Sequence, residues 1–156
     1  MASILWRETW ALWQFGLLKV PMIFWVKPTV LALTDEQVTL KIPLKRRTKN
    51  HLNSMYFGAL CVGADVAGGI HMLHFMKSSL NRFSFVFKDF QAEFLKRPEA
   101  DVHFTSMNGL LIRQTMNKAL QSQSRENALI EVIATTPSLS DEEVARFKLT
   151  LSIKQK

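Results

Sequence analysis

The sequence contains little cysteine, tyrosine, glycine or proline. Among its 156 residues there are one cysteine, one tyrosine, six glycines and five prolines. The single cysteine, Cys61, excludes an internal disulfide framework and a cysteine-rich metal site. So few glycines and prolines exclude collagen-like and proline-rich architectures. With 47% hydrophobic and 21% charged residues, the composition is that of a folded chain about one domain long.

The chain is basic, with a formal net charge of +7. Such a surface attracts phosphate groups, whether they belong to nucleic acid, an anionic membrane or a phosphorylated ligand. Four of the cations form a run just before a long apolar segment, and no aromatic residue interrupts it: Lys45, Arg46, Arg47 and Lys49. Single-strand nucleic-acid sites interleave aromatic and basic residues. We therefore expect no nucleic-acid partner.

Two apolar stretches have the length of a membrane span, residues 10–26 and 54–75. The first is interrupted by Lys19 and Pro21, and the second carries Asp65 near its middle. A carboxylate at the centre of a bilayer is costly. The N-terminal stretch also lacks the pattern of a signal peptide. We expect no stable membrane insertion and a cytoplasmic location, which the lone cysteine fits.

Periodicity predicts helices at 3–17, 53–77 and 108–121, and strands at 38–45, 83–94, 102–104, 128–136 and 145–154. Ser3 is the expected cap of the first helix, and Asn53 or Ser54 that of the second. Residues between Pro21 and Pro28 are expected to be extended. The alternation in strand 83–94 slips at Asp89, which is typical of a β-bulge.

The helix over 53–77 is apolar on nearly every side, which indicates burial on every side. Strands that wrap around one central helix define an α+β architecture. We expect an N-terminal helix and extended flank at 1–35, followed by the main domain at 36–156.

Residues 50–67 resemble the signature of hotdog-fold acyl-CoA thioesterases, in which Asn, Gly and His-Gly-Gly-Ala-Leu lead into a helix carrying Leu-Ala-Asp-x-Ala. In this sequence Asn50 stands at the family's Asn, Asn53 at its first Gly, Tyr56-Phe57-Gly58 at His-Gly-Gly, Ala59-Leu60 at Ala-Leu, and Ala64-Asp65-Val66-Ala67 at the carboxylate motif. Residues 94–97, 101–104 and 144–154 also resemble a branch of this superfamily known mainly as a domain of unknown function.

The residues themselves suggest the same chemistry. Desolvation raises the pKa of a buried carboxyl group such as Asp65 and makes its carboxylate a better base or nucleophile. Gly58 near a helix N-terminus exposes N–H groups that polarise a carbonyl. Tyr56 and Asn50 are candidates for orienting the thioester or water. The alternatives are a paired Asp65, a Tyr56 in the core and an Asn50 that only makes a turn.

Gly58 and Asp65 are seven residues apart, about 10 Å along a helix. They share a face but cannot contact one carbonyl together. If both act, a second antiparallel copy of the helix must supply one of them. This predicts a twofold homodimer with two composite sites, and leaves pairing of dimers into tetramers open. The resemblance implies the same arrangement.

The sequence thus predicts a protein that hydrolyses or binds an acyl thioester, with the basic run on the phosphates of coenzyme A and no other cofactor. The alternative is a non-catalytic acyl-CoA or acyl-carrier binding protein. A dehydratase would need His51 as its base, and a membrane-surface protein would follow from charge alone. His71 and His74 lie one helical turn apart without a third ligand, so we expect no metal.

Overall fold

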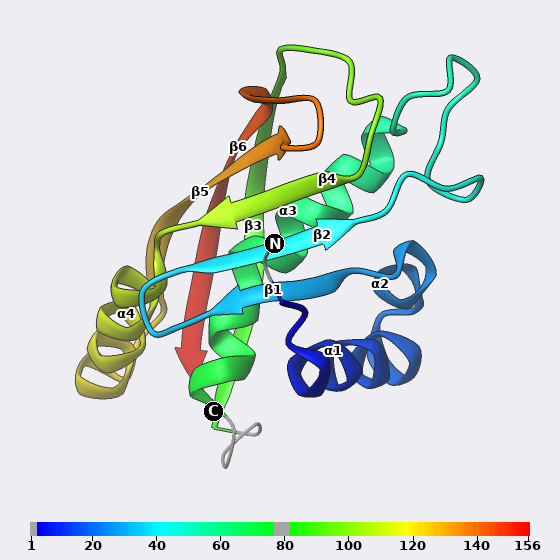
Figure 1. Cartoon of the computed structure of the whole chain (residues 1–156). Coiled ribbons are helices and arrows are strands. Elements are labelled where there is room, and N and C mark those ends of the chain that lie inside the picture. The colour runs from blue at the N-terminus through cyan, green and yellow to red at the C-terminus, as the bar shows by residue number, and fades with distance from the viewer. Residues whose placement is uncertain (1–2, 77–81) are drawn as a thin grey trace.

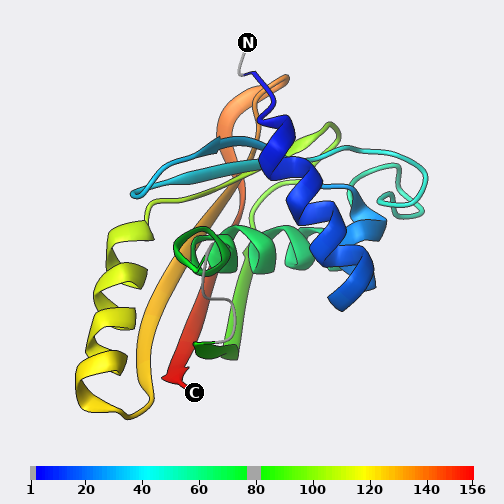
Figure 2. The same cartoon turned by 90° about the horizontal axis from the view of Figure 1, so that it is seen from below.

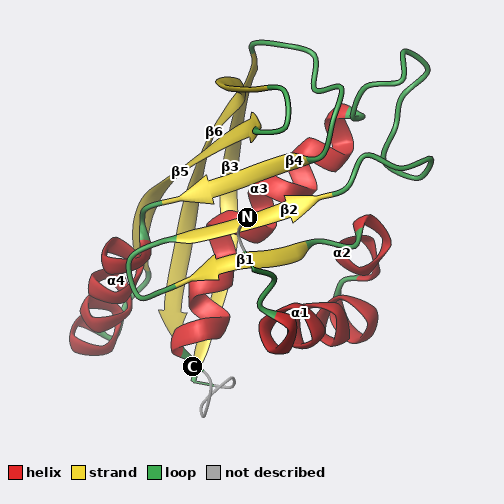
Figure 3. Ribbon diagram, in the orientation of Figure 1, coloured by secondary structure: helices red, strands yellow, loops and turns green. Residues whose placement is uncertain are grey.

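The computed structural model describes residues 3–76 and 82–156 and shows one antiparallel sheet curved around a long helix (Figure 1). The six strands lie in the order β1-β2-β4-β5-β6-β3. The elements are α1 (Trp6–Lys19), α2 (Pro21–Val26), β1 (Thr29–Leu33), β2 (Val38–Ile42), α3 (Phe57–Phe75), β3 (Phe83–Phe94), β4 (Val102–Ser106), α4 (Gly109–Ser122), β5 (Glu126–Thr136) and β6 (Ser140–Gln155). Figure 3 separates the sheet from the helices. The expected α+β hotdog architecture is confirmed.

The helix α3 fills the concave side of the sheet. It packs against β2, β4, β5 and β6, and the view from below shows the sheet curving around it (Figure 2). Its apolar residues face these strands on several sides of the helix, so most of its side chains are buried. The helix α3 is long and apolar enough to cross a membrane. However, 61% of its apolar 18-residue stretch is buried inside the protein. It is therefore a core helix.

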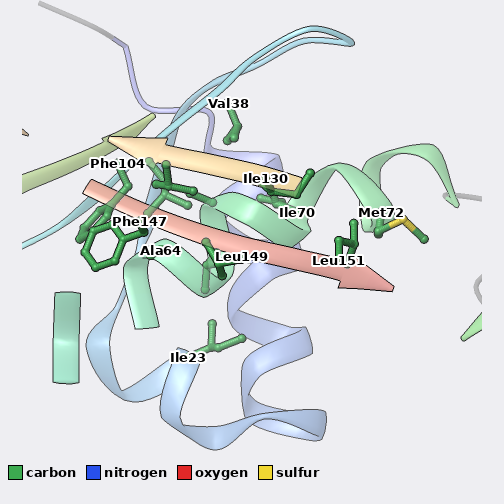
Figure 4. Close-up of a cluster of buried hydrophobic side chains, with 14 of the residues drawn as sticks. Ile23, Val38, Ala64, Ile70, Met72, Phe104, Ile130, Phe147, Leu149 and Leu151 are labelled. Atoms are coloured by element: carbon green, nitrogen blue, oxygen red, sulfur yellow. The ribbon is translucent and has the colours of Figure 1, made fainter. Parts of the chain in front are cut away.

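The core gathers side chains from α3 and from the inward faces of the strands (Figure 4). Phe104 of β4 and Phe147 of β6 are fully buried, with ring centroids 6.4 Å apart. The Phe104 ring lies directly against the backbone of Gly63, where a Cβ atom would overlap it. Glycine is thus required at this position because an aromatic ring from the sheet occupies the space of a side chain.

The start of α3 differs from the prediction. The helix begins at Phe57 with Tyr56 as its N-cap, and no side chain caps it, so the assignment of Asn53 or Ser54 as the cap was wrong. Asn53 has a φ of 60°, in the left-handed region, and therefore lies in a turn before the helix.

The bulge predicted at Asp89 is confirmed. The pairing of β3 with β6 shifts register between Phe87 and Phe90. The Asp89 carboxylate accepts the backbone N–H of Thr150 at 3.0 Å and so bridges the interruption in the ladder. β3 pairs with β6 alone and forms one edge of the sheet.

The N-terminal region folds more fully than expected. Ser3 does not cap α1, which begins after Leu5. Pro21 opens α2 instead of an extended segment, because proline at the first helical position gives up an N–H that has no partner there. After Lys27, at φ 52°, the chain forms β1, an unforeseen strand that pairs with β2. The division of the chain at residue 35 stays a prediction.

The contact between Gly63 and Phe104 generates a stability prediction. Gly63→Ala should lower the free energy of unfolding by about 1–3 kcal/mol, because the added methyl group forces a buried ring to move. Gly69→Ala is the matched control on the same helix. Its Cβ would lie 3.5 Å from the Phe87 ring, an ordinary contact, so it should be neutral or stabilising by up to about 1 kcal/mol. Denaturant unfolding measures both, and equal effects would contradict this packing.

Candidate functional site

The loop before α3 is built by internal hydrogen bonds that fix where the helix starts. The buried Thr48 donates its hydroxyl to the carbonyl of Pro43 at 2.7 Å and accepts the N–H of Lys45 at 2.9 Å. The Tyr56 N–H donates to the Thr48 carbonyl at 2.8 Å. The loop therefore holds the first turn of α3 in a defined position next to the basic run.

Asn50 shapes this loop. Its Oδ1 accepts the backbone N–H groups of Leu52 at 2.9 Å and Ser54 at 3.2 Å, and its amide donates to the Ser54 hydroxyl at 3.0 Å. The structure thus shows the turn-making role for Asn50, and a contact with substrate stays a proposal. Asn53 occupies the left-handed region, which glycine and asparagine tolerate best, and this explains how it can replace the family's glycine.

The N-terminus of α3 offers free hydrogen-bond donors. The first backbone N–H with an intrahelical partner is that of Ala59, which donates to the Tyr56 carbonyl at 2.9 Å. The N–H groups of Phe57 and Gly58 have no backbone acceptor or side-chain cap among the described residues. Such donors, together with the helix dipole, bind anions and polarise carbonyl oxygens.

The aromatic ring of Tyr56 covers Gly58. A Cβ atom at residue 58 would overlap the edge of the tyrosine ring, so glycine is needed for this placement. Tyr56 is 48% exposed, and its ring is tilted by 57° against that of Phe57, with ring centroids 4.8 Å apart. Tyr56 is therefore a surface side chain at the helix entrance and not a core residue.

Asp65 lies two turns further along the same face of α3. Its side chain is half-buried, and burial raises the pKa of its carboxyl group above the ordinary value of 3.8. Among the described residues no cation or hydrogen-bond donor offsets this desolvation. The alternative of a paired, structural Asp65 therefore finds no support within the chain.

A cavity of about 550 Å³ opens beside the start of α3. One wall is the loop with Asn50 and Tyr56, and the other is the β3–β4 connection with Phe94 and Arg97. Sequence reasoning assigned no function to this second wall, although residues 94–97 carried part of the family resemblance. Neither Gly58 nor Asp65 lines the cavity, so one chain does not bring all the predicted site residues together.

The basic run precedes this loop in the chain, and none of its four residues lines the cavity. Lys45, Arg46, Arg47 and Lys49 are all exposed in the loop that leads into α3. None of these four side chains forms an ion pair within residues 3–76 and 82–156. Their charges are available to a phosphorylated ligand.

The histidines lie elsewhere. His71 is buried and contacts the Thr34 carbonyl at 3.0 Å, while His74 pairs with Asp35 at 3.2 Å. His51 is exposed in the loop before α3. In the part of the chain that the structure describes, no three His, Cys, Asp or Glu residues are grouped to hold a metal ion.

The curved sheet around one central helix defines the class of the protein by its fold, a hotdog-fold protein. The chain belongs to the family described as Domain of unknown function (DUF4442), whose model matches residues 8–153. This match includes most of α1 and all of the sheet except the last two residues of β6. No curated protein matches the sequence.

Solved structures share this fold across nearly the whole chain. A protein of unknown function from Pseudomonas aeruginosa, described as a probable thioesterase, is 21% identical with a TM-score of 0.76, over 95% of this chain and 96% of that one. A protein of unknown function from Chlorobaculum tepidum is 10% identical with a TM-score of 0.80, over 99% of each chain. A thioesterase from Haemophilus influenzae is 15% identical with a TM-score of 0.65, over 91% and 88%.

The raised pKa of Asp65 predicts how Asp65→Asn changes stability with pH. The folded state disfavours the carboxylate form of Asp65. The stability of wild type relative to this variant should therefore fall as the pH rises above about 4, first through the pKa of Asp65 in the unfolded chain and then through its higher pKa in the folded protein. Asp35→Asn should show the opposite trend. The hydrogen bond from His74, together with the charge of Arg113, lowers the pKa of Asp35. The stability of wild type relative to Asp35→Asn should therefore increase as the pH rises, first through the lower pKa of Asp35 in the folded protein and then through its pKa in the unfolded chain.

Urea unfolding at several pH values measures both differences. Parallel pH dependences for the two variants would contradict the assigned environment of Asp65.

Proposed function

We propose that the protein is an acyl-CoA thioesterase that acts as a homodimer in the cytoplasm. The observation that carries the proposal is Asp65, a half-buried carboxyl group with a raised pKa and no partner within the described chain. An unpaired buried charge is costly, and a fold keeps one more readily where it has a use.

The reaction needs a base or nucleophile and a site for the oxyanion. The Asp65 carboxylate takes a proton from water while the water oxygen bonds to the thioester carbonyl carbon, or the carboxylate attacks that carbon itself. The Gly58 N–H at the start of α3 holds the oxygen as it gains negative charge. The carbon–sulfur bond then breaks, and coenzyme A leaves as the thiol with the proton that Asp65 took from water. In the nucleophilic route the sulfur takes its proton from water instead, and a water molecule then hydrolyses the acyl–Asp65 anhydride to release the acid and restore the carboxylate.

A second copy of the chain completes the site. Gly58 and Asp65 are about 10 Å apart along one helix, so each must work with the other residue of a partner helix. Strand β3 supports such pairing, because this edge of the sheet is 12 residues long and pairs with β6 alone. Three apolar side chains on it are 42–53% exposed: Val86, Phe90 and Phe94. A twofold partner would cover this edge.

The remaining predicted residues would hold the substrate. The four cations of the basic run suit the phosphates of coenzyme A, since they are exposed and carry no acidic partner among the described residues. Tyr56, above Gly58, is placed to orient the acyl thioester or the water through its hydroxyl group. Asn50 would act mainly by fixing the loop.

One observation favours a second candidate, a protein that binds acyl-CoA or acyl carrier without turnover. Tyr56 replaces the family's histidine, and its ring covers the glycine that the thioester must approach. Binding without release of free thiol would select this alternative.

Coenzyme A release from a panel of acyl-CoAs tests the proposal. Asp65→Asn should lower kcat/KM by about a hundredfold or more, because the amide can neither accept the proton nor attack the carbonyl. Asp141→Asn removes an exposed carboxylate of β6 and should leave the rate unchanged. Equal rates for wild type and Asp65→Asn would remove Asp65 from the mechanism.

The composite site predicts recovery of activity in mixed dimers. Gly58→Val and Asp65→Asn should each be inactive alone. A dimer with one chain of each kind keeps one intact Gly58 facing one intact Asp65. After unfolding and refolding together in equal amounts, the mixture should therefore reach about a quarter of wild-type activity, since half the dimers carry one working site of two. Absence of recovery, with mixed dimers shown by native mass spectrometry, would place both residues of each site on one chain.

A further inference from the structure

The tryptophans are concentrated in one part of the molecule. All four lie between residues 6 and 25, on α1 and α2: Trp6, Trp10, Trp13 and Trp25. Trp13 has a structural partner, since its indole N–H donates to the Pro28 carbonyl at 2.7 Å. The other three make no such bond among the described residues and are 54–64% exposed.

These side chains form a continuous apolar face on α1. Trp6, Trp10, Trp13 and Leu17 follow one another at spacings of four, three and four residues, which places them on one side of a helix. The adjacent side, about 100° around the helix, with Thr9, Leu12 and Gly16, is buried against the body of the protein. Figure 2 shows α1 on the outside of the fold, with α3 on its inner side. The neighbouring α2 adds Met22 and Trp25, each more than 60% exposed.

The charge of this region is complementary to an anionic surface. Residues 3–34 contain three basic side chains, Arg7, Lys19 and Lys27, and one acidic side chain, Glu8. The Lys27 ammonium lies 4.3 Å from the centroid of the Trp13 ring and 3.4 Å from that of Phe24. Partial burial, and then the nearby charge of Arg47, lower the pKa of Lys27, so one cation of the basic run lies near Lys27.

An apolar cavity opens beside the same helix. It has a volume of about 280 Å³ and lies between α1 and the second half of α3, with Leu12, Phe15 and Ile70 in its wall. Arg7, Glu8 and Ala11 also line it, and the Arg7 guanidinium lies 3.7 Å from the Glu8 carboxylate. The apolar walls of this cavity suit an alkyl chain.

We infer that α1 and α2 form a docking surface for an anionic lipid bilayer. Tryptophan favours the boundary between headgroups and acyl chains, and an amphipathic helix with nearby cations binds there in the plane of the membrane. The chain does not cross the membrane in this arrangement. Trp6, Trp10 and Leu17 enter the interface, while the neighbouring cations contact lipid phosphates. The inference is independent of thioester hydrolysis.

Vesicle binding by the full chain tests the inference without any thioester. Vesicles of phosphatidylcholine with about 30% phosphatidylglycerol should bind the protein in flotation and shift its tryptophan emission to shorter wavelength. Binding to vesicles of pure phosphatidylcholine should be weaker by about tenfold or more. Added salt should weaken binding to the anionic vesicles. Because all four tryptophans lie in the proposed surface, their emission reports on it directly.

A triple variant, Trp6→Gln, Trp10→Gln and Leu17→Gln, should lose binding by about tenfold or more, with Trp13 and Trp25 left as probes. Three leucines exposed elsewhere, 48–62%, provide the matched control: Leu110→Gln, Leu129→Gln and Leu139→Gln. That control should bind like wild type. Arg7→Glu with Lys19→Glu tests the charge with the apolar face intact, and should lower binding to the anionic vesicles alone.

Failure of wild type to float with anionic vesicles, or equal binding by the triple variant and its control, would overturn the inference. Loss of a dimer in the triple variant, without vesicle binding by wild type, would assign this face to a second copy of the chain. Vesicle binding is measured without any thioester, and coenzyme A release without vesicles, so failure of one proposal is distinguishable from failure of the other.

Discussion

The arrangement of this protein depends on one carboxyl group in the central helix. Asp65 is half-buried on α3, its pKa is raised by desolvation, and no described residue of its own chain pairs with it. A carboxylate at this half-buried position lowers the stability of the folded state. The proposed roles of the other site residues depend on the position of Asp65. The free N–H groups at the start of α3 lie too far from Asp65 along the same helix for both to act on one substrate atom.

The sheet and the helix hold that carboxyl group in place. Glycine at position 63 lets the Phe104 ring of β4 pack onto the α3 backbone, and the buried rings of Phe104 and Phe147 fill the space beside it. The bulge at Asp89 accompanies the bend of the long edge strand β3 beside the helix. In this frame most of α3 is buried, and Asp65 is half-buried.

Much of this frame could be predicted from the sequence. Strict alternation in residues 145–153 marked β6, and the slip at Asp89 marked the bulge, because both patterns depend only on which side chains face the core. The start of α3 was misplaced, since the left-handed turn at Asn53 and the hydrogen bonds of Asn50 arise from loop geometry that periodicity does not encode. β1 was missed because Pro21 and Pro28 suggested an extended segment broken by both prolines, whereas one proline starts a helix and the other precedes a strand.

The candidate site was predictable in part. The family resemblance pointed to Gly58 and Asp65, and the charge pattern pointed to the basic run. The second wall of the cavity forms only when the end of β3 at Phe94 and the β3–β4 connection with Arg97 fold back towards α3. The placement of the Tyr56 ring over Gly58 likewise depends on side-chain packing.

The central claim is that Asp65 of one chain faces the helix start of another. The mass of the active species in solution tests this most directly, measured by native mass spectrometry on the fraction that releases coenzyme A. The account predicts a species of twice the 17.9 kDa chain mass, or a multiple of that dimer. Full activity in a species of 17.9 kDa would contradict it.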